Sequence, residues 1–154
     1  MGGIMLRFRR GDLFASQAQT LVNPVNCVGV MGKGLALAFR QRFPRMYHDY
    51  LARCRRGEVR PGQPYLFAET TPWILNFPTK DHWHNPSKLS CIEDGLKALV
   101  DQIPTWGIES LALPALGCGL GQLSWDAVRP LLVRHLEPLD IPVEVYLLPF
   151  NRKP

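Results

Sequence analysis

The chain has 154 residues, of which 46% are hydrophobic and 20% are charged. This length and balance predict one globular domain, placed at residues 1–154, and are too small for two. No apolar run approaches the roughly 20 residues that cross a bilayer, and the first residues match neither a secretory nor a myristoylation signal. We therefore expect a cytoplasmic protein without a membrane partner.

The net charge is +5 and the sequence pI is about 9.3. Much of the excess lies between residues 40 and 60, in an arginine-rich stretch. These side chains form either solvated helix faces or a surface that faces a polyanion such as nucleic acid, and charge alone leaves both readings open. They are Arg40, Arg42, Arg45, Arg53, Arg55, Arg56 and Arg60.

Neither a metal site nor a disulfide framework is expected. The four cysteines lie far apart and form no Cys-x-x-Cys pair. His82 and His84 have a spacing that suits two metal ligands, but no third ligand is placed to complete the set. We expect no metal and no cofactor.

The first elements are two strands. Residues 4–10 alternate apolar and basic side chains, which is typical of a half-buried strand. Asp12 follows this strand, either as a turn or cap residue or as an acceptor for an exocyclic amine or a ribose hydroxyl. Residues 20–26 are a short buried strand, which Pro24 is expected to stop from continuing as a central strand.

A glycine-rich loop at residues 29–34 then leads into helical sequence. Aromatic residues recur at helical spacing from Phe39 to Tyr50, which favours core packing over a base-stacking platform. Pro44 interrupts the pattern, so we expect two short helices between Gly34 and Cys54.

The second half alternates strands and helices. Residues 65–69 and 73–77 predict a hairpin. A helix follows, started by Ser87 or by a capping box at Ser90–Glu93 and ended by Pro104. A strand at 110–114, a second glycine-rich loop at 115–121, a helix capped by Ser124 with a kink at Pro130, and a strand at 143–148 complete the chain. This alternation predicts one α/β domain with three layers, whose ligands bind at the carboxyl ends of the strands.

The two glycine-rich loops each connect an apolar strand to a helix. Glycines let bare amides approach an anion, and a helix N-terminus adds partial positive charge, so such loops hold phosphates. The Gly32-Lys33-Gly34 turn of the first loop has the spacing of neither a Walker A motif nor Gly-x-Gly-x-x-Gly. Together the two loops favour a ligand that contains a diphosphate, although the second loop could also be a flexible connection.

Lys80 lies between these loops in the sequence, at the end of an apolar strand. Asp81, His82, Trp83 and His84 follow it directly. A surface lysine is usually a solubilising charge, but an amine that such neighbours desolvate can act as a base or a nucleophile. We therefore place the chemistry at Lys80.

Three motifs together resemble the macrodomain family, the ADP-ribose-binding fold: Arg10-Gly11-Asp12-Leu13-Phe14, Met31-Gly32-Lys33-Gly34 and Leu113 to Leu120. The resemblance runs through nearly the whole chain and implies a three-layer α/β/α fold with a mixed central sheet. Thr79-Lys80 followed by His84-Asn85-Pro86-Ser87 resembles the branch that contains the human terminal ADP-ribose protein glycohydrolase. It is more similar to the DarG antitoxin macrodomains, which remove ADP-ribose from thymidine in DNA.

The resemblance implies a role for each matching residue. Lys80 takes the place of the catalytic lysine, Asp12 meets the adenine amine, and His82, Trp83 and His84 contact the modified nucleobase or the DNA. One departure concerns Gly121, because the human relative has an aspartate there that completes a covalent route through the lysine. The implied ADP-ribose contacts are Asp12, Leu13, Asn26, Val30, Gly32, Lys33, Gly34, Leu35, Gly117, Cys118, Gly119, Leu120, Gly121, Phe150 and Asn151.

The function implied by the resemblance is a glycohydrolase that releases ADP-ribose from thymidine bases in single-stranded DNA, as the antitoxin to a DNA ADP-ribosyltransferase toxin. The expected partners are ADP-ribose as product, ADP-ribosylated single-stranded DNA and, through a region absent from this chain, the cognate toxin. Two alternatives remain open. One is a binding module that holds ADP-ribose without turnover, and the other is a hydrolase of protein-linked ADP-ribose or O-acetyl-ADP-ribose.

Overall fold

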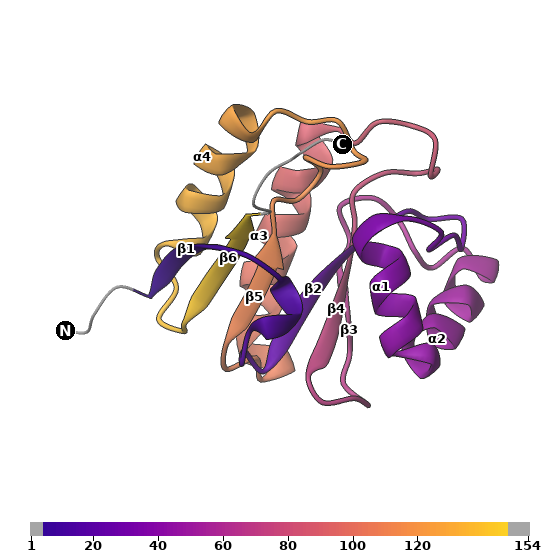
Figure 1. Ribbon diagram of the computed structural model, residues 1–154, viewed down its shortest axis with the longest axis horizontal. Coiled ribbons are helices and arrows are strands. Elements are labelled where there is room, and N and C mark those ends of the chain that lie inside the picture. Colours follow the sequence, from indigo (N-terminus) through magenta and orange to yellow (C-terminus); the bar gives the residue numbers. More distant parts are fainter. Residues whose placement is uncertain (1–4, 148–154) are drawn as a thin grey trace.

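The computed structural model describes residues 5–147, and its centre is a six-stranded sheet (Figure 1). The strands lie in the order β1-β6-β5-β2-β4-β3. Neighbouring strands are parallel except for β3, which pairs antiparallel with β4, so the sheet is mixed as expected. The strands are β1 (Leu6–Arg10), β2 (Thr20–Val25), β3 (Tyr65–Phe67), β4 (Trp73–Pro78), β5 (Leu111–Pro114) and β6 (Val143–Leu147).

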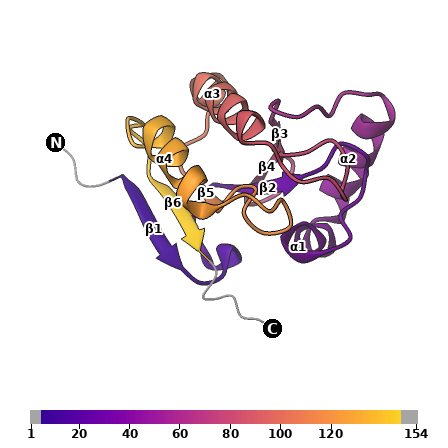
Figure 2. The same cartoon turned by 90° about the horizontal axis from the view of Figure 1, so that it is seen from above.

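Helices cover both faces of this sheet, as Figure 2 shows from above. One face carries the long helix α3 and helix α4, and the other carries α1 and α2. The helices are α1 (Gly34–Arg42), α2 (Pro44–Arg55), α3 (Leu89–Trp106) and α4 (Trp125–Leu136), with a short 3-10 helix η1 (Leu13–Ala15) after β1.

The alternation of side chains along the strands separates two hydrophobic cores. Successive residues of a strand point to opposite faces of its sheet. In β2, Val22 packs with the α3 and α4 core, whereas Leu21 packs with the α1 and α2 core. In β4, Leu75 and Ile74 divide in the same way. These two cores, one on each side of the sheet, confirm the three-layer α/β/α prediction.

The prolines have mixed outcomes. Pro44 is the first residue of α2, a position that needs no N–H, and this confirms the two short helices. The prediction that Pro104 ends a helix is wrong, because α3 continues to Trp106 and is ended by Gly107, whose φ of 76° is left-handed. The prediction for Pro24 is also wrong, since β2 is central. β2 pairs with β5 only at Thr20 and Leu21, so no donor toward β5 is needed at Pro24.

Other boundaries differ from prediction by a few residues. Ser87 does not cap α3, which begins at Leu89 without a side-chain cap. Ser124 caps α4 as expected, accepting from the Asp126 N–H at 3.1 Å. The hairpin is confirmed, with β3 ending at Phe67.

The topology gathers five strand ends at one edge of the sheet. Strands β1, β2, β4, β5 and β6 are parallel, so their carboxyl ends share an edge, which we call the carboxyl edge. The strands that precede both glycine-rich loops and Lys80 are β2, β5 and β4, which are neighbours in the sheet order. The fold therefore brings these three segments together.

Candidate functional site at the carboxyl edge

Three segments at the carboxyl edge form the candidate site. We call residues 29–34 loop 1, residues 115–121 loop 2 and residues 79–88 the Lys80 segment. Hydrogen bonds tie the Lys80 segment to loop 2 and to the chain just before loop 1: the Ser87 N–H donates to the Gly121 carbonyl at 2.9 Å, and the Cys27 N–H donates to the Asp81 carbonyl at 3.0 Å. Loops 1 and 2 also meet, since a Cβ placed on Gly34 would lie 3.5 Å from Leu120 Cδ1.

Asn26 holds the chain that leads into loop 1. Its buried side chain accepts from the N–H groups of Val28 and Val30 at 3.1 and 3.3 Å, and its amide donates to the Val30 carbonyl at 2.7 Å. The hydroxyl of Tyr50, on α2, donates toward Asn26 and lies 2.8 Å from its Oδ1. The residue that the resemblance assigns to the distal ribose therefore also shapes the loop around it.

Loop 1 ends in free amides at the start of a helix. Gly34 has a φ of 57° and begins α1, and Lys33 is the N-cap residue without a side-chain cap bond. The Leu37 N–H donates back to the Lys33 carbonyl, so the amides of Gly34, Leu35 and Ala36 precede the first intrahelical bond. Amides at such a position attract an anionic oxygen.

Loop 2 has little room for a side chain at Gly117 and Gly121. Gly117 has a φ of 76°, and a Cβ there would lie 2.7 Å from Leu123 Cδ1. A Cβ on Gly121 would lie 2.3 Å from Ser87 Oγ and 2.5 Å from the Gly117 carbonyl oxygen. The acid that the human relative has at this position therefore does not fit this backbone.

Lys80 points at loop 2. Its Nζ lies 3.4 Å from the carbonyl oxygen of Leu120, and its side chain is half-buried. Within residues 5–147 no carboxylate forms an ion pair with it. Burial lowers the pKa of the Lys80 amine, because desolvation disfavours the charged form. A neutral amine has the lone pair that a base or nucleophile requires.

Cys118, a nearby cysteine, is less suited than Lys80 to act as a base or nucleophile. Burial raises the pKa of the Cys118 thiol in loop 2 to about 11, so it stays protonated near neutral pH. Its Sγ donates to the Leu116 carbonyl at 3.6 Å.

The aromatic cluster follows Lys80 directly. The ring centroid of Trp83 lies 5.5 Å from that of His82 and 5.3 Å from that of His84. The Nδ1 atoms of the two histidines are in contact. Trp83 is 52% exposed, so about half of this residue is accessible to a partner. In the part of the chain that the structure describes, no three His, Cys, Asp or Glu side chains are grouped as metal ligands.

The residues predicted for the adenine end are only partly described. Asp12 follows β1 at the carboxyl edge and caps η1, with Oδ1 accepting from the Phe14 N–H at 2.9 Å. Leu13 is buried beneath it. Phe150 and Asn151 lie outside the described residues, so their predicted contacts remain predictions.

Two structural roles were missed from the sequence. Ser87, which the sequence predicts as a helix cap, is 5% exposed, and its backbone and side chain both lie against Gly121. Tyr50 was interpreted as core alone, yet its hydroxyl supports Asn26. The only signal for the second role was a tyrosine where a phenylalanine would have filled the core.

Comparison with known proteins gives the family of this arrangement. A family profile described as Macro domain matches residues 22–132. A fusion protein of Thermosipho africanus, named DNA ADP-ribosyl transferase-DNA ADP-ribosyl glycohydrolase, is 44% identical over 89% of this chain and 40% of its own length. The chain spans about 40% of the length of the curated relatives it matches first.

Two solved structures are similar throughout the described fold. The macrodomain of Mycobacterium tuberculosis DarG has a TM-score of 0.88 at 43% identity, covering 94% of this chain and 98% of that one. Thermosipho africanus DarTG in complex with ADP-ribose also has a TM-score of 0.88 at 43% identity, covering 96% of this chain and 43% of that one. In the described part of this chain, no helix is both long and apolar enough to cross a membrane.

Proposed function

This chain belongs to the macrodomain family, and we propose that it is a DNA ADP-ribosyl glycohydrolase that releases ADP-ribose from thymidine in single-stranded DNA. A relative with 44% identity is named as a DNA ADP-ribosyl glycohydrolase, which supports the glycohydrolase activity of the proposal. The same relative joins the glycohydrolase to a DNA ADP-ribosyl transferase. We accordingly propose that this chain acts as the antitoxin to such a transferase.

ADP-ribose lies across the carboxyl edge in this proposal. The free amides at the start of α1 and the backbone of loop 2 hold the diphosphate, as anion-binding turns do. Asp12 accepts from the adenine amine, and Asn26 lies beside the distal ribose. A similar protein of 43% identity has a structure in complex with ADP-ribose, which supports ADP-ribose as the ligand.

Lys80 acts on the distal ribose. The observation that carries this proposal is that its Nζ lies 3.4 Å from the Leu120 carbonyl oxygen, in the loop assigned to that ribose. Two roles suit the amine. It can attack the ribose C1, so that a C–N bond to lysine forms as the bond to the base breaks and the base leaves with the proton that the amine loses. Opening of the C1–O bond of the ribose ring then gives an imine, which water hydrolyses to release ADP-ribose and the free amine. Lys80 can instead stabilise the departing base while water attacks.

The lack of space for a side chain at position 121 favours a mechanism in which Lys80 acts without an additional acidic residue. Gly121 cannot carry a carboxylate on this backbone, because its Cβ would overlap Ser87 and the Gly117 carbonyl. Lys80 therefore has no acidic partner from loop 2.

A binding module that recognises ADP-ribose without turnover is the second candidate. It is favoured by the loop amides, which are placed to hold a diphosphate whether or not Lys80 reacts. Turnover separates the two functions. The protein is incubated with an oligonucleotide that carries ADP-ribosyl-thymidine and, separately, with ADP-ribosylated protein, and free ADP-ribose is quantified. A DNA glycohydrolase releases ADP-ribose from the oligonucleotide; release from neither substrate, with ADP-ribose still bound, supports the binding module, and release from protein alone supports protein-linked ADP-ribose as the substrate.

A further inference from the structure

The seven arginines of the arginine-rich stretch do not form one surface. Helix α1 begins beside loop 2 and runs away from the carboxyl edge, so Arg40 and Arg42 lie about 9 to 12 Å along its axis from that edge. Helix α2 returns, and Arg55 is its last residue. Figure 1 shows these opposite directions.

Contacts place the end of α2 beside the candidate site. A Cβ on Gly29 of loop 1 would lie 3.1 Å from Leu51 Cδ2 and 3.9 Å from Cys54 Cβ. After α2, the Gly62 N–H donates to the Pro78 carbonyl at 3.2 Å, just before the Lys80 segment. The Lys80 segment, loop 1 and the segment from Arg55 to Gly62 therefore adjoin one another along the carboxyl edge.

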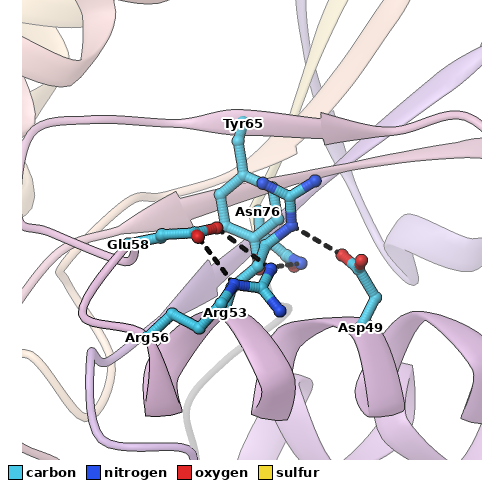
Figure 3. Close-up of polar contacts among 6 residues, drawn as sticks. All are labelled: Asp49, Arg53, Arg56, Glu58, Tyr65 and Asn76. Atoms are coloured by element: carbon cyan, nitrogen blue, oxygen red, sulfur yellow. Dashed lines mark hydrogen bonds and ion pairs between the residues drawn. The ribbon is translucent and has the colours of Figure 1, made fainter.

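Ion pairs neutralise some of the arginines at this end. Figure 3 shows Arg53 bonded to Asp49 at 2.8 Å and Arg56 bonded to Glu58 at 2.6 Å. Arg55 and Arg60 are exposed, and among residues 5–147 neither has a carboxylate within 4.0 Å. Among the described residues, Arg60 donates only to the Gly57 carbonyl, at 3.1 Å. These two guanidinium groups therefore remain available to an anion.

Exposed apolar side chains gather on the same edge. Of the large hydrophobic residues exposed in the described chain, all but Met5 lie in or next to the three site segments. Trp83 and Leu120 are the most exposed, at 52% and 60%. The carboxylates on this edge that no arginine pairs include Asp12, Asp81 and Asp94, and Asp94 packs against Gly62. The exposed large hydrophobic residues in or next to the three site segments are Val28, Val30, Trp83, Leu89 and Leu120.

We propose that the carboxyl edge outside the ADP-ribose site is a track for the DNA strand, in which Trp83 stacks on a base that flanks the modified thymidine and Arg55 and Arg60 bind backbone phosphates. This inference rests on the proposed function. Exposed guanidinium groups alone would suit any polyanion, but stacking on an exposed indole needs an unstacked base, which single strands offer and duplexes do not. The far arginines, Arg40 and Arg42, are not on the track, and their guanidinium groups lie over the rings of Tyr47 and Phe14.

Binding to an unmodified oligothymidine of 12 nucleotides tests the track. Affinity is measured by fluorescence anisotropy over a series of salt concentrations, for wild type, Arg55→Ala/Arg60→Ala and the control Arg40→Ala/Arg42→Ala, which removes the same charge from the same stretch. Each phosphate contact on a single strand contributes about 0.7 to the slope of log K against log salt. We expect the first variant to lower this slope by about 1.4 and the control to leave it unchanged.

Trp83→Ala gives an independent readout. Loss of a stacked base is expected to weaken oligothymidine binding about tenfold without changing the salt slope. Equal losses in both arginine variants, or full affinity in both the Arg55/Arg60 and Trp83 variants, would overturn the track.

A kinetic comparison separates this inference from the proposed function. ADP-ribosyl-thymidine is supplied within the 12-nucleotide strand or within a dinucleotide. We expect Arg55→Ala/Arg60→Ala to raise KM for the long substrate only, at an unchanged kcat. If the variant raises KM equally for both substrates, the proposed track is wrong, but the proposed hydrolase activity is unaffected. If wild type releases nothing from either, the hydrolase is wrong, and the binding measurements still decide the track.

Discussion

Lys80 is half-buried at the carboxyl edge, and that burial predicts how activity depends on pH. Desolvation places the pKa of its amine below the ordinary value of 10.5. If Lys80 attacks the ribose as a nucleophile, its amine must be deprotonated, so the rate of ADP-ribose release is expected to rise with pH and to level off above this pKa; if a Lys80 ammonium stabilises the departing base, the rate falls instead. Single-turnover rates over a pH series measure this. A rate that stays flat, or that falls as pH rises, would be incompatible with a deprotonated lysine.

Gly121 is predicted to tolerate no side chain. A Cβ there would lie 2.5 Å from the Gly117 carbonyl oxygen and 2.3 Å from Ser87 Oγ, so loop 2 must move. We expect Gly121→Ala to lower the free energy of unfolding by about 1–3 kcal/mol and to weaken ADP-ribose binding. Urea denaturation and calorimetric titration with ADP-ribose measure the two effects.

Gly119→Ala is the matched control for this stability measurement, because a Cβ at Gly119 would have no atom within 4 Å. Ser87→Gly in the Gly121→Ala background restores little, since the clash with the Gly117 backbone remains. Equal unfolding free energies for the two alanine variants would refute this account of loop 2.

At the scale of elements, a buried polar chain crosses the sheet between strands. Asn23 on β2 donates to Asn76 Oδ1 on β4 at 3.0 Å, and Asn76 donates to the Tyr65 hydroxyl on β3 at 3.0 Å. Arg53 lies 4.4 Å above the ring of Tyr65, as Figure 3 shows. The asparagines occupy paired positions in the strand register, so their bond fixes β2 against β4.

This chain of bonds predicts non-additive stability effects. Asn76→Val leaves Asn23 without its partner and is expected to cost about 1–3 kcal/mol of unfolding free energy. Asn23→Val/Asn76→Val removes both polar groups and is expected to cost less than the sum of the single variants. Denaturation of the three variants forms a double-mutant cycle. Strict additivity would show that the two amides do not stabilise each other.

Elements were predictable where the signal is local. The helix break at Pro44 and the cap at Ser124 depend on adjacent residues, and both are confirmed. Pro104 does not end α3, because a proline near the end of a helix removes only one intrahelical hydrogen bond. The left-handed Gly107 ends the helix instead. Ser87 does not cap α3, because its position is set by its contact with Gly121 of loop 2, which lies more than 30 residues away in the sequence.

At the scale of the whole molecule, the gathering of the site segments was predictable and their atomic arrangement was not. Alternating strands and helices place the carboxyl ends of β2, β4 and β5 on one edge, independently of how individual side chains pack. The contact between Lys80 and Leu120, and the support of Asn26 by Tyr50, depend on how distant segments pack. The division of the arginine-rich stretch depends on the directions of α1 and α2, which composition does not reveal.

The central claim is that ADP-ribose is held by the two loops and cleaved by Lys80, and Lys80→Ala tests it most directly. Single-turnover release from the modified oligonucleotide is measured beside the Kd for ADP-ribose, with the exposed Lys97→Ala as the control. We expect Lys80→Ala to slow release by about 100-fold or more while ADP-ribose affinity changes by less than about threefold. Release by Lys80→Ala at the wild-type rate would contradict the account.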